Sequence, residues 1–451
     1  MSTRIAFSFV ALAFAFLTCS TPASAQSWSF DARSIALGGG SGSNLATDMV
    51  EEQQSYRAIV LPFGLLQVLS DIDKFDPSSD QFDLVRAVEY AASPLHFVVG
   101  RGTTSTGEAF ITDIRNAGLS RDLNAYRGFA PASELRAEGL AAPSYGKTFF
   151  VSGDRSGAFH GIRIGAGPYL STTTVGFIDP RLIDVLASST PIAIPNKHFV
   201  LTDNSQGQIA LAITGGYRGR IAWPIGVGGG SEREGLYVAA DYNYLHGFRL
   251  EDFGMTVNLD TDGAGLLTIL PSATPIAIRH ASARSGRGMA IDVGVTAVVN
   301  QWEVGFGANG LGNRITWTGV EQETFTLTSL VTGDSEFIES PATLIGDRRV
   351  ELPVDYRGSV AFNSEAWAAV TEVGRGFLGT SFHGGLERRF ERIELRGGAR
   401  YINEKWNPTG GVGFNLSPRV SFDVAAFGTT ANVERKRQLA VAASLRLNRL
   451  N

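Results

Sequence analysis

The sequence predicts an all-β protein: a transmembrane antiparallel up-and-down β-barrel of about fourteen strands, with a partly helical N-terminal segment as a candidate plug. Three observations lead to this fold class. Apolar and polar side chains alternate over long stretches, an export leader begins the chain, and no later stretch is apolar enough for a membrane-spanning helix. Because backbone polar groups must be hydrogen-bonded within a bilayer, such a chain spans a membrane only as a closed barrel.

The alternation is clearest in residues 389–451. From residue 393 to residue 401 the odd positions are apolar or small, whereas the even positions include Glu394, Arg396 and Arg400. Side chains of a strand point alternately to its two faces, so this pattern gives one apolar and one polar face. Turns are predicted at 407–410 and 417–419, where Asn, Pro, Gly and Ser gather. Four alternating segments joined by short turns predict an antiparallel meander.

Residues 1–25 have the pattern of a secretory signal peptide. Arg4 gives a positive n-region, residues 5–17 form an apolar h-region, and Ala23-Ser24-Ala25 is an A-x-A cleavage site. The apolar run is too short to anchor the chain as a membrane-spanning helix. Cys19, the only cysteine, lies in this leader, so the mature chain has no disulfide and no thiolate site. We therefore expect export to the cell outer membrane, with its lipid and the barrel-assembly machinery as partners.

Three regions are expected: the signal peptide at 1–25, an N-terminal region at 26–144, and the main part of the barrel at 145–451. The N-terminal region has a first strand within 57–69, a helical pattern at 81–92, and mixed helical signal over 105–142 that includes 133–137. This region is compatible with three roles: a plug, a periplasmic cap or a long loop. Its small-residue start is the candidate plug lead-in, with Arg33, Gly38, Gly39, Gly40 and Asp48 as its marked residues.

The strand pattern continues from about residue 145 to the end of the chain. Residues 287–308 give the clearest hairpin, with a tight turn near residue 300. Strands reach about ten residues, the length that a tilted strand needs to cross the hydrocarbon layer. Charges fall on the face opposite the apolar one, as a polar lumen requires. The residues expected to face the lumen are Asp241, Asp292, Glu303, Glu394, Arg396, Arg400, Asp423 and Arg446.

Aromatic residues gather near the ends of the predicted strands, the position of the aromatic girdles at the two membrane interfaces. They are Tyr217, Trp223, Phe248, Trp302, Trp317, Tyr401 and Trp406. A soluble β-sandwich with surface aromatics is the alternative. Strands of about ten residues favour the barrel, since soluble strands average about five to six residues.

The sequence predicts no catalytic, cofactor-binding or metal-binding site, and hence no enzyme. Residues 305–310 match GxGxxG, but a turn and a strand pattern follow in place of the helix that a dinucleotide site needs. The histidines lack metal-ligand spacing. Ser381, His383 and Glu387 offer a weak hydrolytic alternative, which polar lumen residues explain more simply. A net charge of −5 without a basic stripe argues against a nucleic-acid partner.

Residues at both ends of the mature chain resemble a known family. The lead-in, with Ala32-Arg33, Gly38-Gly39 and Ala46-Thr47-Asp48, resembles the mature N-terminus of outer-membrane barrels related to the fatty-acid transporter FadL. That group includes PorV-like and TraF-like barrel proteins. Residues 395–401, 410–414 and 420–426 look like its closing strands, and Asn309-Gly310-Leu311-Gly312 is similar to its Asn-Leu-Gly turn.

The resemblance implies a FadL-like, porin-like role: passive transport of small hydrophobic molecules, with the N-terminal segment partly blocking the lumen. The expected ligand is then a small hydrophobic molecule. The same group offers an alternative, a structural or assembly barrel that anchors or shuttles a secreted partner. An outer-membrane enzyme is the weaker alternative.

Overall fold

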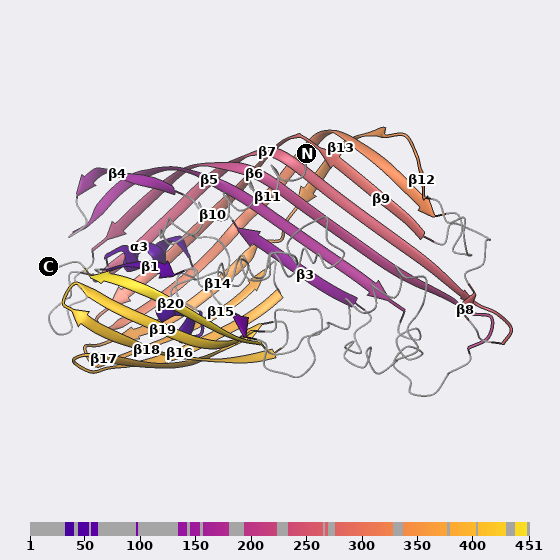
Figure 1. Cartoon of the computed structure of the whole chain (residues 1–451). Helices are drawn as coiled ribbons and strands as arrows, with labels where there is room; N and C mark the ends of the chain where they lie inside the picture. Colours follow the sequence, from indigo (N-terminus) through magenta and orange to yellow (C-terminus); the bar gives the residue numbers. More distant parts are fainter. Residues whose placement is uncertain are drawn as a thin grey trace.

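The chain forms one large curved antiparallel β-sheet, with two short helices near one end of it, in a computed structural model (Figure 1). The structure describes residues 32–39, 44–53, 56–61, 96–97, 134–141, 145–153, 157–179, 194–222, 233–264, 267–268, 276–327, 337–376, 379–402, 405–429 and 438–448. The signal-peptide pattern at 1–25 and the helical pattern at 81–92 lie outside these residues.

The described elements are two helices and twenty strands. The helices are α2 (Ala32–Ala36) and α3 (Leu45–Gln53). The strands are β1 (Tyr56–Leu61), β2 (His96–Phe97), β3 (Glu134–Ala141), β4 (Tyr145–Gly153), β5 (Phe159–Ile178), β6 (His198–Ile221), β7 (Gly235–Thr261), β8 (Leu267–Thr268), β9 (Ile276–Ala283), β10 (Ser285–Val299), β11 (Trp302–Leu327), β12 (Phe337–Glu339), β13 (Thr343–Glu351), β14 (Asp355–Asn363), β15 (Trp367–Gly376), β16 (Gly379–Arg389), β17 (Ile393–Ile402), β18 (Lys405–Ser417), β19 (Val420–Thr429) and β20 (Gln438–Asn448).

Several of these strands are collinear parts of one longer strand. β9 and β10 both pair with β7 and with β11, β12 to β14 follow one another along β11, and β3 and β4 follow one another along β5. When collinear strands are counted as one, the described strands occupy fourteen positions in the sheet, in line with the expected number of about fourteen. In order across the sheet they are β1 with β2, β20, β19, β18, β17, β16, β15, β14 with β13 and β12, β11, β10 with β9 and β8, β7, β6, β5, and β4 with β3. Among these strands no pairing joins β1 to β3 or β4.

The two faces of the sheet differ sharply in polarity. One row of paired residues on the outward face passes through Val295, Phe306, Val373, Phe382 and Trp406, whose exposed fractions lie between 38% and 57%. On the inward face the carboxylates of Asp241, Glu372, Glu387 and Asp423 are buried. A soluble protein has the reverse arrangement, whereas a sheet surrounded by lipid requires an apolar outer belt. No helix in the described ranges is long and apolar enough to cross a membrane.

Strand length divides the sheet into two parts. β15, β16, β17, β19 and β20 have 10 or 11 residues, close to the ~9–11 that a tilted membrane crossing takes. β6, β7 and β11 have 24, 27 and 26 residues. Tight turns, such as the one between Val299 and Trp302, join the strands at one end. The long strands therefore extend beyond the apolar belt at the opposite end.

Two local predictions from the sequence are wrong. The helical signal at 133–137 falls on β3, whose residues pair with β5, so pairing with a neighbouring strand overrides the local propensity. The turn expected at 407–410 lies within β18 instead, and β17 meets β18 through the pair Ile402 and Lys405. Pro408 is tolerated there because it lies near the start of the strand, before the pairing with β19 begins at Thr409.

Candidate functional site

The interior of the sheet holds the N-terminal segment, which begins with the short helix α2 and continues with α3. α3 starts at an N-cap: the side-chain oxygen of Asn44 accepts hydrogen bonds from the backbone N–H groups of Ala46 (2.9 Å) and Thr47 (3.0 Å). Thr47 Oγ1 in turn lies 3.0 Å from Thr296 Oγ1 on β10. α3 contacts β7, β10 and β11, so its first turn is fixed to that wall of the sheet.

α2 lies against a different wall, formed by β17, β18, β19 and β20. It ends at Gly38 and Gly39, whose φ angles of 91° and 72° suit glycine and close the helix. His383 Nδ1 donates to the Gly38 carbonyl at 2.7 Å, and Thr409 Oγ1 donates to the Ala36 carbonyl at 2.9 Å. The end of the helix is therefore satisfied by side chains of the sheet, which hold the segment in place.

Glycines of the sheet form the surface on which both helices rest. A Cβ at Gly385 would lie 2.5 Å from the Leu37 backbone, and one at Gly411 would lie 2.7 Å from the Ala36 side chain. On the other wall, a Cβ at Gly307 would lie 2.3 Å from the Asn44 side chain. Such distances are too short for real atoms. The segment therefore approaches the strands more closely than any side chain at these positions would allow.

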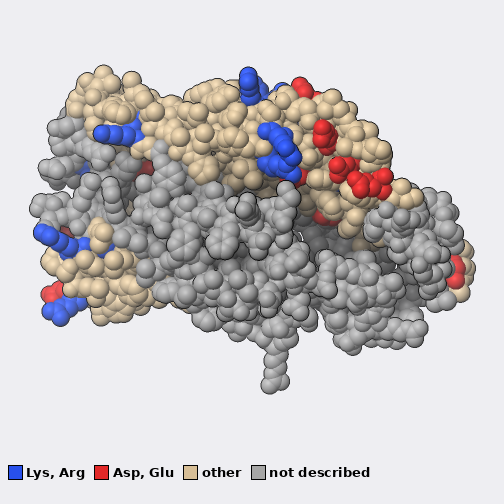
Figure 2. All heavy atoms as spheres, turned by 45° about the horizontal axis from the view of Figure 1, so that its top comes forward, with Lys and Arg blue, Asp and Glu red and all other residues tan. Residues whose placement is uncertain are grey.

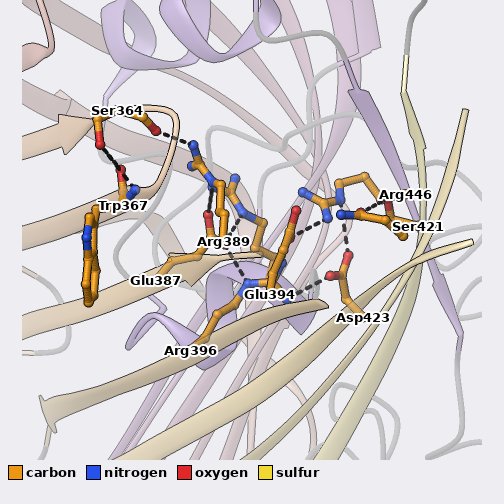
Figure 3. A network of polar contacts seen from close by, with 11 residues as sticks. Ser364, Trp367, Glu387, Arg389, Glu394, Arg396, Ser421, Asp423 and Arg446 are labelled. Atoms are coloured by element: carbon orange, nitrogen blue, oxygen red, sulfur yellow. Dashed lines mark hydrogen bonds and ion pairs between the residues drawn. The ribbon is translucent and has the colours of Figure 1, made fainter. Parts of the chain in front are cut away.

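A network of buried ion pairs connects α2 with the closing strands (Figure 3). Glu387 on β16 accepts a bidentate pair of hydrogen bonds from Arg33, at 2.8 Å and 3.0 Å, and a further bond from Arg396 at 2.6 Å. Arg396 also donates to Asp423 at 2.7 Å and to Glu394. Because both charge signs are present and hydrogen-bonded, burial of these groups is compensated.

Other strands carry similar buried polar clusters on the inward face. Arg218 binds both carboxylate oxygens of Asp241, at 2.6 Å and 2.7 Å. Asp292, directly opposite Asp241, accepts hydrogen bonds from Asn243 and from the Gly310 backbone, both at 2.7 Å. These contacts link β6, β7, β10 and β11 across the interior of the sheet.

The sequence named eight residues as lumen-facing, and the structure places them in different surroundings. Glu394, Arg396, Asp423 and Arg446 form one network, since Arg446 donates to Glu394 at 2.6 Å. Asp241 and Asp292 are neighbours in a second cluster. Glu303 lies 3.6 Å from Arg233. Arg400 lies 5.1 Å above the Phe427 ring. The predicted set lacks two partners of these residues, Arg218 and Glu387, although Glu387 was named in the hydrolytic alternative. Alternation alone places both on the same face as their partners.

The plug lead-in residues are also accounted for, apart from Gly40, which lies outside the described residues. Arg33 pairs with Glu387, Gly38 and Gly39 end α2, and Asp48 is buried in the first turn of α3. The weak hydrolytic alternative places Ser381, His383 and Glu387 together. In the structure His383 bonds to the Gly38 carbonyl and Glu387 bonds to arginines, so neither is oriented by the other.

A buried apolar cluster occupies another part of the inward face. It consists of Tyr169, Ala210, Ala212, Leu245, Leu250, Ala281, Ala283, Ala290, Ile315, Trp317, Val320, Val350 and Leu352. Its strands are β5 to β7, β9 to β11 and β13, away from the network around Glu387. Two polar contacts border it: Tyr169 Oη donates to Asn313 at 3.1 Å and Trp317 Nε1 donates to Gln208 at 2.9 Å.

Trp317 corrects one of the aromatic assignments. Tyr217, Phe248, Trp302 and Trp406 are 40–55% exposed on the outward face, and Tyr401 is half-buried. Trp317 is fully buried instead, with its ring over Gly247 and Gly286. Trp223 lies outside the described residues. Trp317 therefore belongs to the interior cluster and not to a membrane girdle.

In the part of the chain that the structure describes, no group of three or more His, Asp or Glu side chains is placed to hold a metal ion. Many charged side chains of the inward face pair with one another, as Arg218 does with Asp241 and Arg396 with Glu387. The inward face therefore combines buried ion pairs with buried apolar clusters.

A comparison with solved structures finds transporters and a porin that are similar to this chain. The toluene transporter TbuX of Ralstonia pickettii is 11% identical, with 72% of this chain and 91% of that chain covered and a TM-score of 0.32. The toluene transporter TodX of Pseudomonas putida is 13% identical, with coverages of 71% and 89% and a TM-score of 0.31. A mutant porin of Rh. blastica is 7% identical, with coverages of 69% and 100% and a TM-score of 0.25. No protein-family model and no curated protein matches the chain.

These neighbours accord with the FadL-like resemblance of the sequence, but such low identities and TM-scores carry no argument about function. The class of protein rests on the chain itself. Its described strands form an antiparallel sheet of the outer-membrane barrel type, with an apolar outward face and a polar inward face.

Proposed function

We propose that the protein is an outer-membrane β-barrel that gives small hydrophobic molecules a passive route across the membrane. The observation that carries this proposal is the apolar cluster around Trp317, Leu245 and Leu250 on an otherwise polar inward face. Interiors of outer-membrane barrels are normally polar, so an apolar cluster on the inward face is the part of this wall that suits an apolar molecule. Its side chains are at most 9% exposed and pack on one another, so a ligand would have to enter between them. The toluene transporters among the similar structures are named for such a cargo.

The N-terminal segment acts as the plug of this route. It bridges two walls of the sheet, since α2 contacts β17 to β20 and α3 contacts β7, β10 and β11. Arg33, Gly38 and Asn44 are the contact points that fix it. The contacts of the segment with the sheet are side-chain and close-packing contacts and not strand pairing, so its displacement would leave the paired strands intact, which a gated passive route requires.

Uptake of radiolabelled toluene and of a labelled alkane tests the proposal, in cells that express the protein and in matched deletion cells. Expressing cells should accumulate both probes faster. Ala281→Glu places a charge in the apolar cluster and should lower the uptake rate by about tenfold, the factor that corresponds to roughly 1.4 kcal/mol. Equal uptake by expressing and deletion cells would remove the transport proposal.

Ser282→Glu is the matched control. Ser282 follows Ala281 on β9, so its side chain points to the opposite face. The two variants introduce the same charge one residue apart, and heat-modifiable migration on gels verifies that both fold. Ser282→Glu should transport as the unmodified protein does. A similar loss in both variants would show that the apolar cluster has no particular role.

The structural alternative, a barrel that anchors or shuttles a secreted partner, is favoured by a different observation. β6, β7 and β11 extend far beyond the length of a membrane crossing and form a large ordered surface outside the belt. Under this alternative the deletion cells take up both probes normally but fail to retain or export a surface protein. Comparison of the surface and secreted proteins of the two strains distinguishes the two functions.

A further inference from the structure

Three arginines lie side by side on the outward face, directly above the apolar belt. Arg287 on β10 pairs with Thr316 on β11, and Thr316 pairs with Arg349 on β13. Arg314 lies two residues before Thr316 on β11, on the same face. Neighbouring strands are about 4.8 Å apart, so Arg287 and Arg349 are roughly 10 Å apart along the row.

The rows below these arginines show that the face is the outward one. The row that contains Arg314 continues through Met289 and Tyr244 to Ile213, which is 47% exposed. The next row contains Tyr242, which is 48% exposed. Between Trp302 at the tight turn and Arg314 the strand has about the length of one membrane crossing. The arginines therefore lie at the upper edge of the belt.

These guanidinium groups have little compensation from the protein. Arg349 forms an ion pair with Glu351, but both side chains are more than half exposed, so this pair contributes little. Arg287 is exposed, and neither Arg287 nor Arg314 forms an ion pair within the described ranges, although the exposed Glu351 lies directly across from Arg314 on β13. The buried arginines of the inward face, such as Arg218 and Arg396, do have carboxylate partners.

Both charge signs occur beyond this row, where Arg249 pairs with Glu251 and Arg279 pairs with Asp252. Glu251, Glu321, Glu323 and Glu339 lie on the strand extensions farther from the belt, and all are exposed or half-buried. Figure 2 shows the same order on one face: a broad expanse without charged side chains, then a group of Lys and Arg, then Asp and Glu toward the right. The first charged side chains above the apolar rows are therefore mainly arginines.

A long connection, from Ile178 to His198 at the end of the sheet where the arginine row lies, identifies the leaflet. Outer-membrane barrels have short periplasmic turns and longer extracellular connections. The arginine row lies at the end of the belt away from the tight turn between Val299 and Trp302. If the sheet is inserted in the membrane as proposed above, the row is at the headgroup level of the outer leaflet.

We propose that Arg287, Arg314 and Arg349 bind the phosphate groups of phosphorylated glycolipid in the outer leaflet. Guanidinium groups bind phosphate oxygens through paired N–H donors, and three of them within one row suit a headgroup with more than one phosphate. The acyl chains of the same lipid lie against the apolar rows below, around Ile213 and Tyr242. The ligand is therefore amphipathic, with its phosphate groups next to its acyl chains. A free phosphate ion has no acyl chains and cannot contact the apolar rows. The inference rests on the proposed membrane insertion.

The test uses the full mature chain in detergent micelles, titrated with diphosphorylated lipid A and followed by native mass spectrometry. The triple variant Arg287→Gln, Arg314→Gln, Arg349→Gln should bind lipid A at least tenfold more weakly, since each cation at a lipid surface contributes on the order of a fivefold factor. The corresponding triple lysine variant keeps the charge and should retain most of the affinity. Dephosphorylated lipid A should bind the unmodified protein about as weakly as it binds the triple glutamine variant.

Arg392→Gln with Arg419→Gln is the control, because both arginines are exposed near the tight turns at the other end of the belt. This variant should bind lipid A normally. Unchanged binding in the triple glutamine variant, or competition by millimolar inorganic phosphate alone, would overturn the proposal. If a glutamine variant does not fold, single substitutions at Arg287 and Arg349 give the same comparison. Failure of all forms to enter lipid vesicles would instead overturn the proposed membrane location.

Discussion

At the residue scale, Glu387 has the most demanding surroundings on the inward face. Its carboxylate is fully buried and accepts hydrogen bonds from Arg33, Arg389 and Arg396. Each guanidinium would be costly to bury alone, and the carboxylate is their shared counter-charge. Glu387 therefore has two roles: it joins the N-terminal segment to the sheet, and it neutralises the arginines on β16 and β17.

Glu387→Gln should lower the free energy of unfolding by about 3 kcal/mol, because it leaves buried guanidinium groups without a counter-charge. Arg33→Gln should cost less, about 1 kcal/mol, since Glu387 retains two other partners. Urea titration in detergent, followed by gel mobility, measures both. Glu391→Gln, an exposed site near a tight turn, is the control and should have no effect. Equal small effects in all three variants would contradict a structural role for the network.

At the scale of elements, the N-terminal segment is positioned by glycines of the strands. Gly385 leaves space for the backbone of Leu37, directly after α2, Gly411 leaves space for the Ala36 side chain, and Gly307 leaves space for Asn44 at the start of α3. Each pair of facing elements fits only because one of them has no side chain there. The abundance of glycine in the sequence, at 53 residues, is partly explained by this close approach.

Gly385→Ala should displace α2 from the sheet, because the added Cβ would lie 2.5 Å from the Leu37 backbone. Overpacking of this kind costs about 1–3 kcal/mol, which is enough to populate an undocked segment. Limited proteolysis of the mature protein should then cleave the N-terminal segment faster while the strands stay protected. Gly397→Ala is the matched control, since a Cβ there meets nothing within 4 Å. Identical cleavage rates in the two variants would show that the glycine surface does not hold the segment.

At the scale of the whole molecule, the polarity of the two faces implies lipid around the sheet. Val293 belongs to an outward row with Tyr356, which is 47% exposed, and lies in the middle of β10. Val299 is on the same face but next to the tight turn. The two positions therefore differ mainly in depth within the belt.

Val293→Arg should destabilise the folded protein in lipid vesicles by about 2–4 kcal/mol, whereas Val299→Arg should cost about 0–1 kcal/mol. The reason is that charge is expensive at the bilayer midplane and inexpensive near the interface. Folding efficiency into vesicles of defined composition gives both values. Equal penalties, or folding of the unmodified chain without lipid or detergent, would contradict the membrane location.

The sequence by itself determined the alternating strands and the antiparallel all-β fold class. A period of two is a local property, so it can be read from neighbouring residues. It is interrupted at Gly310 and Gly312, where β11 shifts register twice against β10. The two shifts together restore the original alternation, so Trp317 lies on the same face as Glu303. Trp317 was misplaced because the sequence put it near a strand end, whereas it lies within the 26-residue strand β11.

Only the tertiary structure decided which polar residues meet. Arg33 and Glu387 are separated by 354 positions, and Gly385 lies beneath Leu37 because the chain folds back on itself. No local pattern encodes a contact at such separation, since many residues of the right type lie on the same face. The sequence pattern therefore shows that one face of the sheet carries charged residues. The folded arrangement of the strands and of α2 and α3 determines which of these charges pair and where the N-terminal segment lies.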